Sequence, residues 1–310
     1  MAASEKRPPV FVEHEGTDKR WLALCREACT AAGMLEVGIK ALSHADFNRQ
    51  DLYYAGFFNV TIAMERICKL VLDSQRFYEK GEFLKGGELS KLGHSLTNLY
   101  RKVQNIEESF SEGISSRRVD IPLDELEDIL NFLTDFAKKD RYYNLESLTK
   151  NGGADPIKRW RKLVTQHHPM PALTEEQRDE MRKADMCGEE GVYFDMLFPS
   201  VNGNNIERPS EYLREKWEDR HVQIEGVSVL YSLFRYLSKV LGHFSGAWPV
   251  QVRDAEEKLD EQSAGQTLMM EKMKIREGSL QLPWYSDFFD FFDFFEHDAS
   301  WLKNKLMRES

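Results

Sequence analysis

Residues 52–72 read LYYAGFFNVTIAMERICKLVL, and residues 88–103 read ELSKLGHSLTNLYRKV. In the first stretch, apolar side chains recur at alternating steps of four and three, which is typical of one seam of a helix. Glu65 and Lys69 lie on another side of that helix, at the i,i+4 spacing of a favourable ion pair. A short break that contains glycine separates the two stretches. Together they predict a helical hairpin with polar groups beside its core seam. The seam residues are Tyr53, Phe57, Val60, Met64, Ile67 and Val71.

The same periodicity predicts helices before and after the hairpin. One begins near Asp18 and continues to Leu42, and another follows the polar loop of residues 109–120. Four amphipathic helices joined by modest loops favour an up-and-down bundle. Further on, Thr174 is expected to cap a charged surface helix, and a long helix is expected over residues 210–244. The predicted fold class is therefore all-α: an up-and-down helical bundle with an additional helical C-terminal half.

Breaks in the pattern suggest four segments along the chain. Residues 1–17, with two adjacent prolines, are expected to form a flexible arm. Residues 18–148 form the predicted bundle, and residues 149–209 a basic linker and irregular insertion. Residues 210–310 form the predicted helical C-terminal region, which ends in an aromatic helix.

Composition narrows the class of protein. The chain has 310 residues, a hydrophobic content of 41% and a net charge of −10. This content is enough for a sizeable core, and the acidic balance argues against a nucleic-acid binder that uses its whole surface. No apolar stretch reaches the length of a membrane span, and the N-terminus lacks the apolar region of a secretory signal. With only four cysteines, a cytoplasmic protein without membrane partners is expected.

Several reaction motifs are missing from the sequence. It has no Walker phosphate loop, dinucleotide fingerprint, HExxH, GxSxG or CxxC pair, so the corresponding enzyme classes lose most of their support. Cys25 and Cys29 share a helix face, but no histidine or second cysteine pair accompanies them at ligand spacing. Neither a metal site nor a cofactor is predicted.

The charge inverts between Lys138 and His168, where eight bases stand against three acids. Trp160 lies within this basic segment, between Arg159 and Arg161. Phosphate contacts from the arginines and stacking of a nucleic-acid base on the indole are one interpretation. The alternative is a solvated basic face, with His167 and His168 in a loop before a proline.

The hairpin also resembles the helical bundles called HEPN domains (higher eukaryotes and prokaryotes nucleotide-binding). The resemblance rests on the E…K pattern of Glu65 and Lys69, and on the GH-x-L pattern that contains His94. It covers residues 18 to 148. It implies RNA or nucleotide binding, in a toxin or phage-defence setting. Glu65, Lys69 and His94 are candidate binding residues, and if Arg66 and Arg141 also converge on Glu65 and Lys69, the site would suit an anion or a nucleotide. The alternative is that Glu65 and Lys69 form a surface helix pair and that His94 is a capping or hydrogen-bonding group.

Ribonucleases of the HEPN family use an Arg-x(4–6)-His motif at a dimer interface. No histidine follows Arg141 at that spacing, whereas Arg161 precedes His167 and His168 suitably. If the chain cleaves RNA, these three are the predicted catalytic residues of a metal-independent reaction. A histidine would act as general acid and base, and the arginine would stabilise the charge on phosphorus.

The C-terminal stretch PWYSDFFDFFDFFEHD repeats aromatic pairs every three residues. As a helix it would gather Phe288, Phe292 and Phe295 on one face. Such a face either docks on the protein's own core or forms an interface with a second subunit or another protein. The alternative function is accordingly a non-catalytic interaction or scaffold protein that oligomerises through aromatic helices.

Overall fold

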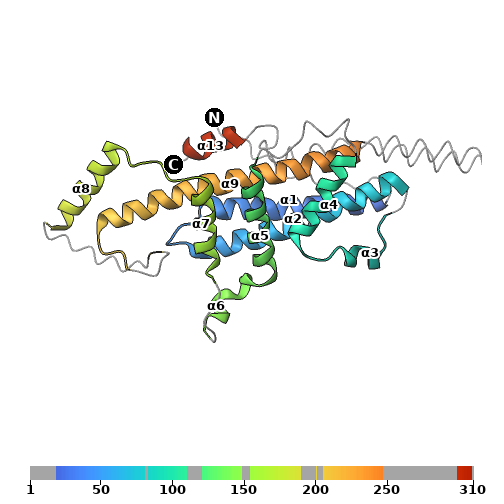
Figure 1. The fold of residues 1–310 in the computed structure, drawn as a ribbon, viewed down its shortest axis with the longest axis horizontal. Helices are drawn as coiled ribbons and strands as arrows, with labels where there is room; N and C mark the ends of the chain where they lie inside the picture. The colour runs from blue at the N-terminus through green and yellow to red at the C-terminus, as the bar shows by residue number, and fades with distance from the viewer. Residues whose placement is uncertain are drawn as a thin grey trace, which may run out of the picture. The chain divides into compact units, whose positions relative to one another are not determined.

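The computed structural model describes residues 19–80, 83–109, 121–148, 154–189, 200, 205–246 and 299–308 (Figure 1). In these residues it contains ten α-helices, one 3-10 helix and no strand, so the chain folds as an all-α helical bundle and the predicted fold class is confirmed. None of the described helices is both long and apolar enough to cross a membrane. The elements are α1 (Lys19–Ser43), α2 (Gln50–Lys80), α3 (Gly86–Lys91), α4 (Leu96–Ser109), α5 (Leu123–Lys138), η2 (Asp140–Tyr142), α6 (Tyr143–Glu146), α7 (Pro156–His167), α8 (Glu175–Glu189), α9 (Pro209–Gly246) and α13 (Ala299–Arg308).

Contacts between residues divide the described chain into two units. The first unit contains α1 up to Leu35, α2 from Ile62, α3, α4, and α9 from Ser232. The second contains the end of α1, α2 up to Thr61, α5 to α8, α9 up to Tyr231, and α13. Each unit therefore combines segments that lie far apart in the sequence.

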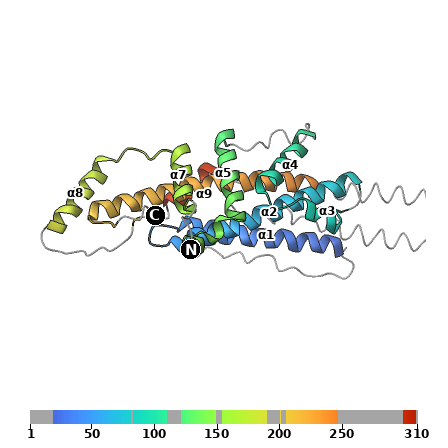
Figure 2. The same cartoon turned by 60° about the horizontal axis from the view of Figure 1, so that its bottom comes forward.

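In the first unit, α1 and α2 lie side by side in both views (Figures 1 and 2). Small side chains of α1 are buried, which allows the two helices to approach closely. Tyr100 of α4 and Tyr236 of α9 add an aromatic contact, with ring centroids 5.6 Å apart. The buried residues of this unit include Ala28, Ala31, Ala32, Leu35, Met64, Ile67, Val71, Leu99, Val103 and Leu237.

In the second unit, an aromatic cluster joins α2, α5 and α7. The ring of Phe57 lies 4.9 Å from that of Phe132 and 5.4 Å from that of Trp160, measured between centroids. Trp160 is only 2% exposed, and its indole lies against the backbone of α9 at Gly226. A β-carbon at Gly226 would come within 2.7 Å of the indole, so only glycine permits this contact. Helices α5 and α7 are neighbours in both views (Figures 1 and 2).

Glycines also bring the end of α1 against the first half of α2. A β-carbon at Gly38 would lie 2.8 Å from a methyl group of Val60 and 3.0 Å from its backbone nitrogen. A β-carbon at Gly56 would lie 2.5 Å from the side chain of Leu42. The two helix backbones therefore touch at this crossing, with no room for larger residues.

Several predicted helices are confirmed in position. These are the helices predicted near residues 18–42, 52–72, 174–184 and 210–244. The side chains of Thr174 and Gln177 each bond to the backbone N–H of the other, which forms a capping box before α8. The predicted aromatic face of Phe288, Phe292 and Phe295 lies outside the described residues.

Two expectations need correction. Residues 88–103 are not one helix, because Gly93 adopts a left-handed backbone (φ 75°) between α3 and α4. Part of the predicted basic linker is the regular helix α7. Asp155 begins it by accepting hydrogen bonds from the N–H groups of Ile157 and Lys158, and Pro156 occupies its first turn.

The crossing of α1 and α2 predicts a position-specific effect of glycine substitution. Gly38→Ala should lower the free energy of unfolding by about 1–3 kcal/mol, because the new methyl group meets backbone atoms. The matched control is Gly33→Ala in the same helix, where nothing lies within 4 Å of an added β-carbon. This control should be neutral or raise stability by up to about 1 kcal/mol. Urea unfolding measures both, and equal effects of the two substitutions would contradict the close crossing.

Candidate ligand-binding site

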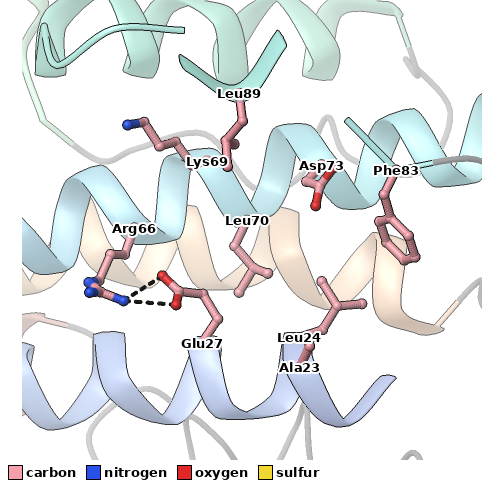
Figure 3. Close-up of a pocket in the computed structure, with 9 residues that line it drawn as sticks. All are labelled: Ala23, Leu24, Glu27, Arg66, Lys69, Leu70, Asp73, Phe83 and Leu89. Carbon is pink, nitrogen blue, oxygen red and sulfur yellow. Dashed lines mark hydrogen bonds and ion pairs between the residues drawn. The ribbon is translucent and has the colours of Figure 1, made fainter. Parts of the chain in front are cut away.

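A pocket of about 420 Å³ opens in the first unit beside the second half of α2 (Figure 3). Its apolar part comes from α1, α2, α3 and the segment before α3. Its charged groups come from α1 (Glu27) and α2 (Arg66, Lys69 and Asp73), and those on α2 follow one another at intervals of one helical turn. This volume lies in the range of pockets that bind small molecules. The described lining residues are Ala23, Leu24, Glu27, Arg66, Lys69, Leu70, Asp73, Phe83 and Leu89.

Arg66 stands at one end of the pocket and is held by Glu27. Both carboxylate oxygens of Glu27 accept hydrogen bonds from Nη1 of Arg66, each at 2.8 Å. Both side chains remain partly exposed, at 36% for Arg66 and 41% for Glu27. Since a guanidinium carries five N–H donors, Nε and Nη2 of Arg66 stay available within the described structure. The ion pair positions the guanidinium and leaves part of it free to bind an anion.

Glu65 connects the two motifs of the hairpin, the E…K pattern of Glu65 and Lys69 and the GH-x-L pattern that contains His94. Its Oε1 accepts a hydrogen bond from Nζ of Lys69 at 2.7 Å, and Nδ1 of His94 lies 2.9 Å from the same oxygen. Burial of Glu65 works to raise the pKa of its carboxyl, but the hydrogen bonds from Lys69 and His94 outweigh it, so this pKa lies below its ordinary value. The left-handed Gly93 turns the chain immediately before His94. The structure thus brings together three of the predicted binding residues.

Asp73 is the charged group at the other end of the pocket. Its Oδ1 accepts a hydrogen bond from the backbone N–H of Leu84 at 2.7 Å. Figure 3 shows the carboxylate pointing from α2 toward the space between Leu70 and Phe83. Oδ2 has no hydrogen-bond partner within the described part of the chain. Burial raises the pKa of this carboxyl above its ordinary value, and the single backbone hydrogen bond offsets that only in part.

The predicted residues of the basic segment lie in the second unit, where Trp160 belongs to the aromatic cluster. Because its indole is buried, a nucleic-acid base could stack on it only if α7 left the core. Its neighbour Arg159 pairs with Asp135 at 2.9 Å and with Asp140. Arg141 donates to the backbone carbonyl of Ala137. Among these three residues, only the exposed Arg141 offers its cation to solvent without a carboxylate partner in the described structure.

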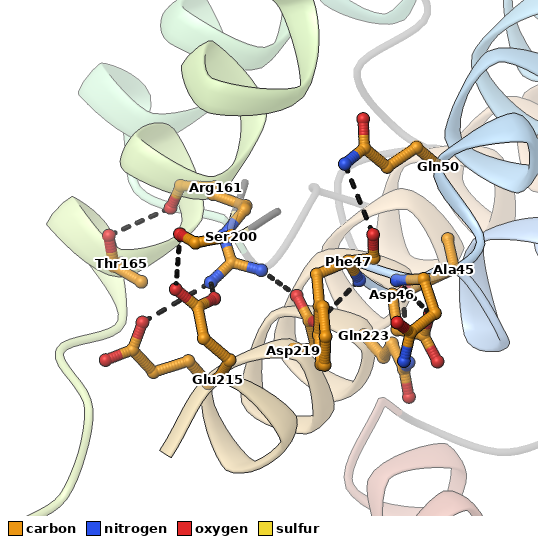
Figure 4. Close-up of polar contacts among 12 residues, drawn as sticks. Ala45, Asp46, Phe47, Gln50, Arg161, Thr165, Ser200, Glu215, Asp219 and Gln223 are labelled. Carbon is orange, nitrogen blue, oxygen red and sulfur yellow. Dashed lines mark hydrogen bonds and ion pairs between the residues drawn. The ribbon is translucent and has the colours of Figure 1, made fainter. Parts of the chain in front are cut away.

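Arg161 lies among three acids of α9, of which Asp219 is buried (Figure 4). Its Nη2 is 3.0 Å from Glu215 and 3.3 Å from Glu218, and its Nη1 pairs with Asp219. Asp219 is 1% exposed and also accepts the backbone N–H of Phe47, in the loop between α1 and α2. Three carboxylates therefore occupy the guanidinium that was predicted to stabilise a phosphate.

The two predicted catalytic histidines also face carboxylates. Nε2 of His167 lies 2.9 Å from Asp128. The imidazole of His168 lies between two acids, 2.6 Å from Glu125 and 3.3 Å from Glu225. The basic segment is thus matched by acids from distant parts of the sequence. RNA cleavage by the basic segment stays a prediction. In the structure, its ion pairs connect α7 and the following His168 to α5 and α9.

Sequence reasoning missed Asp73, Glu27 and Phe83. Asp73 is one helical turn after Lys69, and this spacing was a usable signal for a second polar group on that side of α2. The hydrogen bond from Leu84 to Asp73 could not be predicted from the sequence, because it depends on the path of the chain after α2.

Comparison with protein-family models, curated proteins and solved structures found no match.

The Arg161 cluster predicts a large loss of stability when the guanidinium is removed. Arg161→Ala leaves the carboxylate of Asp219 buried without a counter-charge, which typically costs about 3–5 kcal/mol. Lys162→Ala, at the exposed neighbouring position, is the matched control and should change stability by less than about 0.5 kcal/mol. Chemical denaturation of both variants tests this. An Arg161→Ala protein as stable as the control would contradict the structural role.

The lowered pKa of Glu65 predicts how one substitution depends on pH. A depressed carboxyl pKa contributes stability above the ordinary value of 4.5, and this contribution is lost as the pH falls through the lowered value. The difference in unfolding free energy between the wild type and Glu65→Gln should therefore be largest near neutral pH and shrink in acid. Glu36→Gln, which breaks a simple pair with Lys40, is the control and should give a smaller difference. A Glu65→Gln effect that is constant from pH 7 to 3 would argue against the bridging role.

Proposed function

We propose that this chain binds nucleotides, with the pocket beside α2 as the binding site. A nucleotide combines an apolar flat base, groups that donate hydrogen bonds, and an anionic phosphate. The pocket offers the complement of each part: apolar walls, the free oxygen of Asp73, and the cations of Arg66 and Lys69. The observation that carries the proposal is this combination within one cavity of about 420 Å³.

The arrangement along α2 gives the ligand a direction. Arg66 and Lys69 lie one turn apart, which suits two contacts to one phosphate group. Asp73 follows one turn after Lys69, about 10 Å from Arg66 along the helix at 1.5 Å per residue. We therefore place the phosphate at the Arg66 end and the base at the end that Phe83 lines.

The existing ion pairs are compatible with an anionic ligand. Lys69 has three N–H donors and spends one on Glu65, and Arg66 uses only Nη1 for Glu27. Glu27 and Glu65 hold the two cations in place before the ligand arrives. Such preorganisation lowers the entropy cost of binding.

A specific observation favours a second candidate, the interaction protein. Near α6, in the second unit, Tyr142, Leu145 and Leu148 are 57%, 66% and 79% exposed. Three large apolar side chains so close in sequence and so exposed are typical of a surface that contacts another protein. Oligomerisation through the aromatic C-terminal segment, RNA cleavage and a toxin or defence role stay predictions.

The nucleotide proposal predicts saturable binding of adenosine 5′-monophosphate that depends on the pocket cations. Isothermal titration calorimetry should show that Arg66→Ala and Lys69→Ala each weaken binding by roughly 10- to 100-fold, since charged hydrogen bonds contribute about 1.5–3 kcal/mol. Adenosine, which lacks the phosphate, should bind more weakly than the monophosphate to the wild type. Lys91→Ala, an exposed cation of α3 that does not line the pocket, is the control and should bind like the wild type.

Two results would overturn the proposal. One is a wild-type protein that shows no saturable binding of any nucleoside monophosphate at millimolar concentration. The other is an Arg66→Ala, Lys69→Ala double variant that remains folded and binds with wild-type affinity.

A further inference from the structure

We propose that Asp73 determines the specificity of the pocket by accepting a hydrogen bond from an exocyclic amino group of the ligand's base. The inference rests on the proposed function and adds the class of base: one that carries an amine, such as adenine, cytosine or guanine. Carboxylates accept hydrogen bonds from such amines when proteins recognise bases.

The geometry around Asp73 leaves one acceptor for a ligand. The N–H of Leu84 donates a hydrogen bond to Oδ1 at 2.7 Å and thereby holds that oxygen toward the backbone. Oδ2 has no partner in the described residues, although the group stands at a largely apolar wall that includes Leu24 and Leu70. Asp73 is half-buried and Oδ2 stays accessible to water, so a ligand donor would replace water at this oxygen without breaking a contact within the described residues.

The aromatic neighbour identifies which part of the ligand reaches Asp73. Phe83 lines the same end of the pocket, and its ring stacks on that of Phe77 with centroids 4.6 Å apart and an interplanar angle of 20°. This backing holds the Phe83 ring in place. Figure 3 shows the ring of Phe83 and the carboxylate of Asp73 at the same end of the pocket. A base that packed against Phe83 would therefore bring its edge, rather than its sugar or phosphate, beside Asp73.

Charge balance supports the same assignment. The other carboxylate of the lining, Glu27, forms an ion pair with Arg66, and Lys69 forms one with Glu65. Asp73 is the one charged group of the described lining that has no ion-pair partner within the described residues. Burial raises the pKa of its carboxyl, and the backbone hydrogen bond from Leu84 opposes this only in part.

The test pairs one substitution with one change in the ligand. Asp73→Asn keeps an oxygen for the Leu84 N–H and removes a charge that burial disfavours, so the variant should fold at least as stably as the wild type. The ligand pair is adenosine 5′-monophosphate and purine riboside 5′-monophosphate, which lacks only the amine. Calorimetric titration gives the four dissociation constants of this cycle.

We expect the wild type to bind the amino-bearing nucleotide about tenfold or more tightly than its analogue, since a hydrogen bond to a charged group contributes about 1.5–3 kcal/mol. In Asp73→Asn the two ligands should bind within about twofold of each other. 2′-Deoxyadenosine 5′-monophosphate should bind the wild type like the ribonucleotide, because the sugar does not face Asp73.

The possible failures differ. Equal binding of the two purine nucleotides by the wild type, or undiminished discrimination by Asp73→Asn, overturns the role of Asp73 while nucleotide binding stands. A loss of affinity for the deoxynucleotide alone overturns it as well, because the carboxylate would then read the sugar. If neither nucleotide binds the wild type, the proposed function fails, and this inference fails with it.

Discussion

The second unit depends on the contact between the indole of Trp160 and the bare backbone of α9 at Gly226. That contact fixes α7 against α9 and places its other side among the rings of Phe57 and Phe132. Once α7 is fixed in this way, the direction of every other side chain on it follows. Arg161, one residue further, is directed into the acids of α9. From the sequence, Trp160 was interpreted as a surface on which a nucleic-acid base could stack. In the structure its burial instead directs the neighbouring arginines into ion pairs within the protein.

Several helices and their order were predictable because they depend on local patterns, although α7 and the break between α3 and α4 were not predicted. Apolar spacing determines the seam of α2, and Thr174 with Gln177 marks the start of α8 within four residues. The role of the basic segment was not predictable in the same way. A local count of charges between Lys138 and His168 omits Asp219 and Glu225, which come from a helix more than fifty residues later. The Asp155-Pro156 pair did mark the start of α7, and it was the available sign that this segment is helical.

The candidate site was predictable in part, for the same physical reason. Glu65 and Lys69 are neighbours on one helix, so their pairing follows from spacing. His94 joins them only because the chain turns at Gly93, and the sequence motif marked the residues without showing the contact. The side of α2 that carries Asp73 could be read from spacing, but the contact of Asp73 with Leu84 and the place of Phe83 depend on the path of the chain after α2. The helix that carries the core seam thus also carries the polar end groups of the pocket, and this link between packing and binding makes α2 central to the proposed function.

The most direct measurement is photo-crosslinking with 8-azidoadenosine 5′-monophosphate, followed by mass-spectrometric mapping of the labelled peptides. Nucleotide binding beside α2 predicts labelling at the pocket lining, within residues 23–27 or 66–89, suppressed by excess adenosine 5′-monophosphate. Labelling that is competed in the same way but confined to α7, around Trp160 and His167, would contradict the account. That result would instead indicate that the nucleotide binds at the basic segment.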